Sequence, residues 1–161
     1  MSGFPQPPSI AELFDKAPPA RPARVFAERY HDICAGHRVV GHEGKCRNLH
    51  GHNYRITFKC EAAALDSLGR VVDFSVIKST LCEWLEREWD HRMLIWSDDP
   101  WRYALKGLDA SVVVVPFNPT AENIGLHLLN VVAPPLLAET GCTLVEVIVQ
   151  ETRKCSAVVA L

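Results

Sequence analysis

The densest group of reactive side chains lies in residues 46–52, which read Cys-Arg-Asn-Leu-His-Gly-His. Residues two apart in an extended strand point to the same side, so His50 and His52 can present both imidazoles to one ion. Gly51 between them lets the backbone or a ligand approach closely. A His-x-His pair alone is a weak signal, and an incidental surface pair is the competing interpretation.

A metal site needs a further ligand, and His37 is the nearest candidate if the strand before it forms a hairpin with the His-x-His strand. His31 and His42 are alternatives that we rank below His37. Three neutral imidazoles leave the fourth position of a tetrahedral zinc open, which is the arrangement of catalytic zinc sites. The same ligands also accept other late divalent ions.

Cys46 is the candidate reactive thiol. It lies four residues before His50, between Lys45 and Arg47. Nearby positive charge favours the thiolate, which is the reactive form of cysteine. A loop thiol without a chemical role is the structural alternative.

Two further places carry acid–base groups. Asp90 and His91 follow a predicted helix, and a carboxylate near an imidazole can fix its tautomer and raise its basicity. A solvated helix end is the simpler alternative for this pair. Glu151, followed by Thr152, ends the last predicted strand. Its carboxylate can accept two parallel hydrogen bonds from an amidine-like edge of a ligand, although a surface charge is the more common explanation of such a residue.

Three other polar residues have structural interpretations. Asp73 and Glu122 fall in or before the first turn of predicted helices, where free amides and the helix dipole favour a negative charge. His127 lies beside Ile124 and Leu128 on a predicted helix and is expected to be packed.

The elements that position these groups follow from periodicity. Period-two patterns predict strands over 24–40, 53–60, 111–117 and 143–151, with a short strand at 70–72. Apolar stripes at three- and four-residue spacing predict one helix from the Asp73 cap to about Trp89, and a second from the Thr120 cap to Pro134-Pro135. This order predicts an α+β fold, an antiparallel four-stranded sheet with two helices on one face.

Composition narrows the class of protein. The chain has 161 residues, is 48% hydrophobic and carries a formal net charge of -2, which suits one domain and gives no electrostatic reason for nucleic-acid or membrane binding. We expect a proline-rich arm over 1–22 and a single domain over 23–161. Without a secretory signal or a long apolar run, we expect a cytoplasmic protein whose six cysteines are free thiols.

Taken together and in order, these segments resemble the 6-pyruvoyltetrahydropterin synthase/6-carboxytetrahydropterin synthase family. The matching segments cover most of the chain outside the arm: they are residues 34–37, 45–54, 69–74, 89–91, 119–123 and 150–152. The resemblance implies the tunnelling fold, and homohexamers with sites at subunit interfaces. It also implies a zinc-dependent lyase acting on a small-molecule pterin.

The resemblance also assigns roles to individual residues. It implies that His37, His50 and His52 bind Zn²⁺. Cys46 would be the catalytic thiol, and Asp90 with His91 the proton relay. Glu151 would anchor the pterin ring, with Thr152 beside it.

The short spacing from Cys46 to His50 resembles the 6-carboxy branch, which serves queuosine (7-deazaguanine) biosynthesis. That branch converts 7,8-dihydroneopterin triphosphate to 6-carboxytetrahydropterin, releasing acetaldehyde and triphosphate. A 6-pyruvoyl synthase, an aldolase-like folate-pathway relative and a non-catalytic zinc-stabilised pterin-binding module are the alternatives. The chain departs from the family pattern at Gly36, in a longer stretch between His91 and Pro119, and in its arm.

Overall fold

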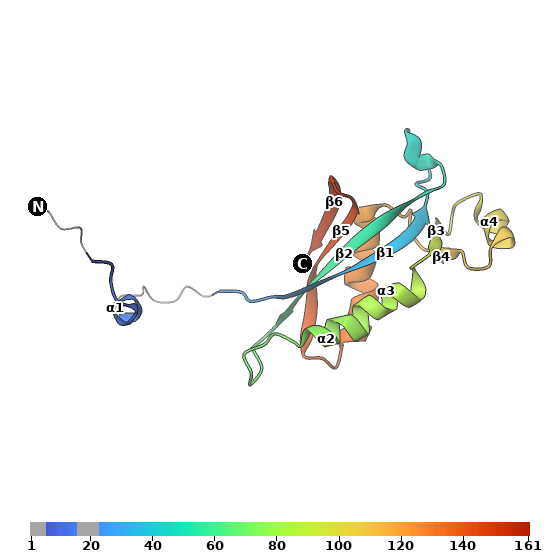
Figure 1. Cartoon of the computed structure of the whole chain (residues 1–161). Coiled ribbons are helices and arrows are strands. Elements are labelled where there is room, and N and C mark those ends of the chain that lie inside the picture. The colour runs from blue at the N-terminus through green and yellow to red at the C-terminus, as the bar shows by residue number, and fades with distance from the viewer. Residues whose placement is uncertain (1–5, 16–22) are drawn as a thin grey trace, which may run out of the picture.

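The protein is built on one six-stranded sheet, seen in a computed structural model that describes residues 6–15 and 23–161 (Figure 1). The strand order is β4-β3-β1-β2-β5-β6. The strands are β1 (Ala27–His37), β2 (His50–Ala62), β3 (Arg92–Trp96), β4 (Val113–Val115), β5 (Cys142–Thr152) and β6 (Cys155–Ala160). The long strands β1, β2 and β5 form its antiparallel centre.

The predicted α+β class is confirmed, but the four-stranded antiparallel sheet is wrong. The sheet is mixed, because β3 runs parallel to β1 and β4 runs parallel to β3. The strand predicted at 111–117 is present as the shorter β4, whereas β3 and β6 were not predicted. Both are short, and β3 joins the sheet through a long crossover rather than a local hairpin. The strand predicted at 70–72 is absent, since Arg70 closes a turn onto Asp66.

Two long helical segments cover one face of the sheet (Figure 1). The first comprises α2 (Phe74–Ile77), η2 (Lys78–Cys82) and α3 (Glu83–Glu88), and the second α5 (Ala121–His127), η3 (Leu128–Val132) and α6 (Ala133–Leu137). Each begins at the predicted cap: Asp73 accepts from Ser75 N, and Thr120 accepts from Asn123 N.

The second segment does not end at Pro134-Pro135 as predicted. The chain makes a π-helical turn over η3, and the prolines then fall in the first turn of α6. Proline lacks the N–H that would continue the helical bonding pattern, and the segment continues past these residues where η3 has already changed that pattern from α- to π-helical.

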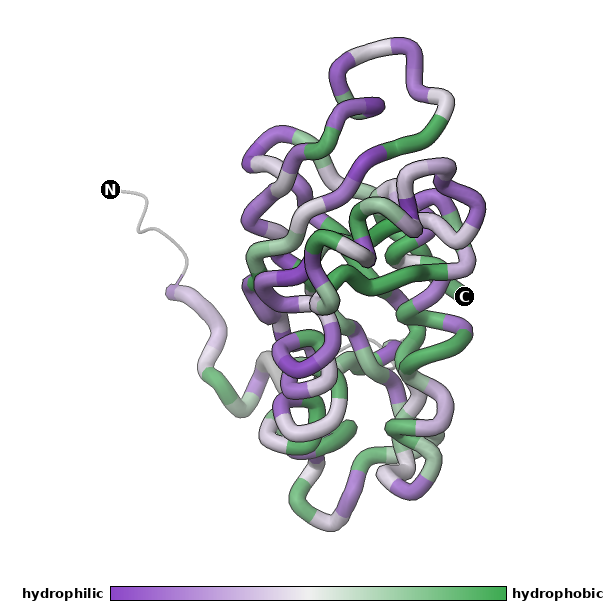
Figure 2. The backbone as a smooth tube through the Cα atoms, turned by 90° about the vertical axis from the view of Figure 1, so that its right-hand side faces the viewer, coloured by the Kyte–Doolittle hydropathy of each residue, from purple (hydrophilic) through white to green (hydrophobic). Residues whose placement is uncertain are grey.

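The hydrophobic core lies between the sheet and these helices. Alternate residues of the central strands are buried, and they pack against the apolar stripes of both helical segments. Figure 2 shows hydrophobic and hydrophilic residues interspersed along the tube rather than separated into blocks. The other face of the central strands is uncovered. We call it the open face, and it carries Tyr30, Asp32, Cys34, Asn53 and Arg55.

The remaining elements are short. They are α1 (Ile10–Asp15), η1 (Lys45–Arg47) and α4 (Arg102–Leu108). Helix α1 falls within the predicted arm, but the boundary expected at residue 22 lies outside the described residues. Among the described residues, none of the helices has the length and hydropathy needed to cross a bilayer.

Candidate active site

Three histidines converge at one end of the β1–β2 hairpin. The register places His37 opposite His50 and Ala35 opposite His52. Strand alternation then puts all three imidazoles on the helix-covered face. One ring nitrogen of each lies within 4.8 Å of the others, and the ring centroids of His37 and His50 are 4.4 Å apart. The three predicted ligands therefore form one cluster.

The donor atoms of this cluster fit a metal ion. His37 Nδ1 is 2.7 Å from the carbonyl oxygen of Pro119, and His50 Nδ1 is 2.8 Å from that of Asn48. A carbonyl can only accept, so both Nδ1 atoms carry the proton and both Nε2 atoms present a lone pair. These two Nε2 atoms are buried and have no hydrogen-bond partner in the described part of the chain. Buried lone pairs without partners are costly, and coordination by a metal would satisfy them.

Burial also keeps His37 in the form that a metal requires. Desolvation, reinforced by the neighbouring His50 and His52, lowers the pKa of His37 to about 4. The bond to Pro119 opposes this shift without reversing it. The imidazole of His37 is therefore neutral at physiological pH.

A carboxylate borders the histidine cluster. Glu151 Oε1 lies 3.9 Å from His37 Nε2 and accepts a hydrogen bond of 3.2 Å from the hydroxyl of Tyr54. Burial and the charge of Glu151 raise the pKa of Tyr54, so the phenol stays protonated and remains a donor. Tyr54 thereby orients one oxygen of Glu151, while the half-buried carboxylate keeps acceptor capacity for a ligand.

Cys46 opens onto the same place. It lies in η1, and its carbonyl accepts from Val39 N at 2.8 Å, which holds the loop against the end of β1. Cys46, His37 and Glu151 together line a cavity of about 260 Å³. A thiol, a buried imidazole and a carboxylate thus converge on a space of small-molecule size.

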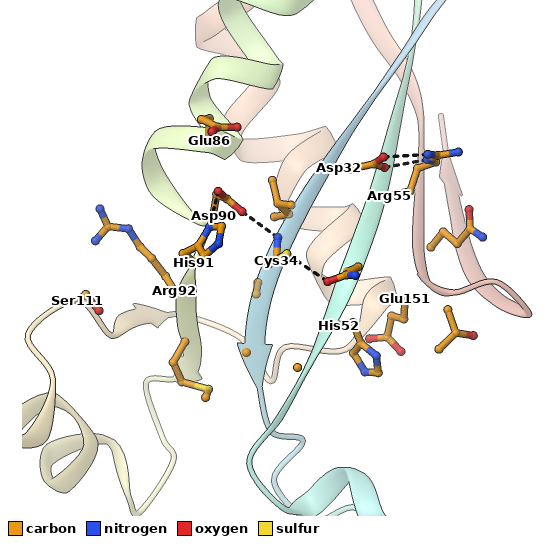
Figure 3. A pocket seen from close by; sticks show the side chains of 18 of the residues that line it. Asp32, Cys34, His52, Arg55, Glu86, Asp90, His91, Arg92, Ser111 and Glu151 are labelled. Atoms are coloured by element: carbon orange, nitrogen blue, oxygen red, sulfur yellow. Dashed lines mark hydrogen bonds and ion pairs between the residues drawn. The ribbon is translucent and has the colours of Figure 1, made fainter.

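Asp90 and His91 lie in a different cavity. His91 Nδ1 is 2.7 Å from Asp90 Oδ2, so the two adjacent residues do bond each other. Partial burial acts to raise the pKa of Asp90, but hydrogen bonds from Cys34 N and His91 outweigh it and leave this pKa below its usual value. Both residues line a groove of about 1230 Å³ that also reaches Glu151 and Thr152. Figure 3 shows the Asp90–His91 pair on one side of β1, and His52 with Glu151 on the other.

The structure also places the other residues that were weighed as site residues from the sequence. His31 is bonded to Glu86 at 2.7 Å and takes no part in the histidine cluster. His42 lines the cavity of Cys46, and its Nδ1 accepts from Gly44 N. Glu122 borders that cavity too, at the start of α5. His127 is half-buried between Trp89 and Phe117, as expected for a packed histidine.

Two residues at the site, Tyr54 and Cys155, were not identified from the sequence. Tyr54 could have been found, because it lies two residues after His52 on the same face of β2. Cys155 lines the cavity of Cys46 from β6, a strand that was not predicted, so no sequence signal placed it there.

The long stretch between His91 and Pro119 packs onto the residue after His37. Arg38 and Asp99 are both buried, with Arg38 Nε 3.0 Å from Asp99 Oδ2. The Arg38 guanidinium also lies 3.8 Å from the centre of the Trp101 ring. The stretch therefore braces the end of β1 that carries His37.

Comparisons with known proteins agree with this architecture. A family model described as 6-pyruvoyl tetrahydropterin synthase matches residues 27–160. The chain is 34% identical to a 6-carboxy-5,6,7,8-tetrahydropterin synthase of Rickettsia typhi, over 77% of this chain and 91% of the relative. It is 36% identical to the protein of the same name from Rickettsia bellii, over 75% and 89% of the two chains.

Solved structures share the fold. An uncharacterized protein of Wolinella succinogenes superposes with a TM-score of 0.76 at 25% identity, over 86% of this chain and 98% of that chain. The 6-pyruvoyl tetrahydropterin synthase of Caenorhabditis elegans superposes with a TM-score of 0.59 at 23% identity, over 86% and 96%. On the match of the family model and the identity to these relatives, this chain belongs to the 6-pyruvoyl tetrahydropterin synthase family.

Proposed function

We propose that this protein is a zinc-dependent 6-carboxy-5,6,7,8-tetrahydropterin synthase. Its substrate would be 7,8-dihydroneopterin triphosphate, and its products 6-carboxytetrahydropterin, acetaldehyde and triphosphate. The observation that carries the proposal is the convergence of His37, Cys46 and Glu151 on one cavity. The 6-carboxy branch is favoured because the Rickettsia relatives, which the chain spans almost completely, bear that name.

Glu151 would bind the pterin ring. Its carboxylate accepts hydrogen bonds from N3–H and the 2-amino group, a charge-assisted pair that fixes the ring in one orientation. The bond from Tyr54 holds the carboxylate in place before the ligand arrives. Thr152 follows Glu151 and borders the groove that leads away from the ring.

The substrate side chain would then lie near the histidines. A zinc ion held by His37, His50 and His52 would supply a Lewis acid that acidifies the side-chain hydroxyls. Cys46 acts as the base that removes a proton from the side chain, since its thiol opens onto the same cavity. Asp90 fixes His91 Nδ1 as a donor, which leaves Nε2 to move the second proton.

Cys46 and the Asp90–His91 pair line different cavities within one chain, and Glu151 borders both. The proposal therefore includes assembly into a homo-oligomer, a hexamer by family resemblance, in which a neighbouring copy brings its Asp90 and His91 to the Cys46 cavity. The uncovered open face, where Tyr30 is 54% exposed, leaves surface for such contacts. The product would enter queuosine biosynthesis, and a cytoplasmic location stays a prediction from the sequence.

The test is mass spectrometry of the products formed by zinc-loaded protein from 7,8-dihydroneopterin triphosphate. We expect 6-carboxytetrahydropterin and acetaldehyde. Accumulation of 6-pyruvoyltetrahydropterin instead would assign the chain to the other branch. Absence of turnover despite bound zinc and pterin would favour a non-catalytic binding module.

The matched variants are Cys46→Ala and Cys142→Ala. The first removes the cavity thiol and should abolish turnover while zinc and pterin still bind. The second removes a thiol at the start of β5, paired with Ala62 at the end of β2 far from His50, and should retain turnover. Full activity of Cys46→Ala would refute the role given to this thiol.

A further inference from the structure

Cys34 is a second thiol beside acid–base groups, on the open face of the sheet. Its backbone N–H donates to Asp90 Oδ1 at 2.8 Å, and its carbonyl accepts from His91 N at 2.7 Å. Its Sγ donates to Asn53 Oδ1 at 3.1 Å. Figure 3 shows Cys34 on β1 next to Asp90 and His91. The thiol, an oxygen of Asp90 and a ring nitrogen of His91 all lie within 4.8 Å of one another.

The orientation of these groups suits thiol activation. Asp90 Oδ2 accepts from His91 Nδ1, so the neutral imidazole has its lone pair on Nε2. One ring nitrogen of His91 lies within 4.8 Å of Sγ, so the imidazole can take up the thiol proton, and an imidazolium beside the sulfur stabilises a thiolate. His91 has a φ of 55°, which is uncommon for a residue other than glycine. The bond from its backbone N–H to Cys34 and the bond from its ring to Asp90 hold His91 in this uncommon backbone conformation.

Other charged groups around Cys34 are largely paired. Asp32 forms a two-bonded ion pair with Arg55, and Glu86 is bonded to His31. Arg92 lines the same groove and lies one residue after His91. The two oxygens of Asp90 are both engaged by donors, which limits its repulsion of a thiolate.

We propose that Cys34 is the nucleophile of a thiol–imidazole–carboxylate group with His91 and Asp90, and that it exchanges with low-molecular-weight disulfides. Its position differs from that of the histidine cluster. Cys34 is exposed between the buried residues Ile33 and Ala35, so it lies on the face opposite to His37. The proposal shares His91 and Asp90 with the proposed pterin reaction, and its test reads the chemistry of Cys34 directly, without a pterin.

The exchange is balanced as follows. The Cys34 proton passes to the His91 imidazole, and the thiolate attacks one sulfur of the disulfide. A new S–S bond forms as the old one breaks, and the departing thiolate takes the proton from His91. Cys34 is oxidised to a mixed disulfide, and one half of the reagent is reduced to a thiol.

The test uses the full-length folded protein and compares two thiols of the same molecule. Cys34 and Cys155 are both exposed. Cys155 lines the cavity of Cys46, but among the described residues only Cys34 has both a histidine nitrogen and a carboxylate oxygen within 4.8 Å of its sulfur. Iodoacetamide at near-neutral pH, followed by peptide mass spectrometry over time, should alkylate Cys34 about tenfold faster than Cys155. In urea the two rates should become equal.

Variants and a second reagent separate the parts of the proposal. His91→Gln should slow Cys34 to the rate of Cys155, and Asp90→Asn should slow it partly. Glutathione disulfide should form a mixed disulfide at Cys34 first, and dithiothreitol should reverse it. Equal rates at Cys34 and Cys155 in the folded protein, or a rate at Cys34 unchanged by His91→Gln, would overturn the activation. Failure of glutathione disulfide to react at Cys34 would overturn the assigned ligand class.

Discussion

Mild acid should destabilise the metal-free protein chiefly through His37. Its pKa is lowered from 6.5 to about 4 in the folded state because the ring is buried. The unfolded chain therefore binds a proton more readily than the folded chain between these two values. Stability is then complete above pH 6.5 and falls as the pH drops toward the folded pKa.

The size of the effect follows from the two pKa values. The full difference, reached below both, corresponds to about 3 kcal/mol of lost stability. At pH 5 the loss should be about 2 kcal/mol relative to pH 7. Carboxylates such as Asp73 and Asp90, whose pKa is lowered below 3.8, add little in this window, because they begin to protonate at lower pH.

The assay is urea unfolding of chelator-treated protein at pH 7 and pH 5, for the wild type and for His37→Gln. Protein concentration must be fixed, because dissociation of an oligomer would enter the apparent stability. The wild type should lose about 2 kcal/mol more than His37→Gln over this range. His127→Gln is the control: burial lowers the pKa of this half-buried ring too, but its removal should leave most of the pH dependence. An identical pH dependence in wild type and His37→Gln would refute the reasoning.

Three further predictions concern the histidine cluster, Glu151 and the buried Arg38–Asp99 ion pair. His52→Ala removes one of three ligands and should weaken zinc binding by at least about a hundredfold in a chelator competition, whereas His31→Ala, whose ring is bonded to Glu86, should bind zinc normally. Glu151→Gln loses the charge of the acceptor and should weaken neopterin binding about tenfold to a hundredfold by fluorescence titration; an unchanged dissociation constant would remove Glu151 from the site. Asp99→Asn leaves the buried Arg38 without its counter-charge and should lower the free energy of unfolding by about 3 kcal/mol, while Asp98→Asn, at an exposed neighbour, should change it by less than about 0.5 kcal/mol.

Local features of the molecule were determined by the sequence itself. The His-x-His spacing places both imidazoles on one face of β2, because strand alternation depends only on the chain's own geometry. The caps at Asp73 and Thr120 formed as predicted, since each bonds an amide two or three residues away. The same alternation also predicts that Tyr54, two residues after His52, lies on the face of β2 that carries the site.

Tertiary structure decided which distant residues meet. His37 lies opposite His50 because of the register of the β1–β2 hairpin. The same register places His31 opposite Ile56, away from the cluster. Strand β3 lies parallel to β1, and this places Asp90 and His91 beside Cys34 instead of Cys46. A parallel neighbour across a helical crossover leaves no periodic signal in the sequence, because its partner is chosen by packing.

The sheet itself shows the same division. Its α+β class followed from the order of strands and helices, whereas its six strands and mixed direction did not. The short strands β3 and β6 have too few residues for a pattern of period two to stand out. They are stabilised by hydrogen bonds to strands already in the sheet, and such long-range bonds exist only once the chain has folded.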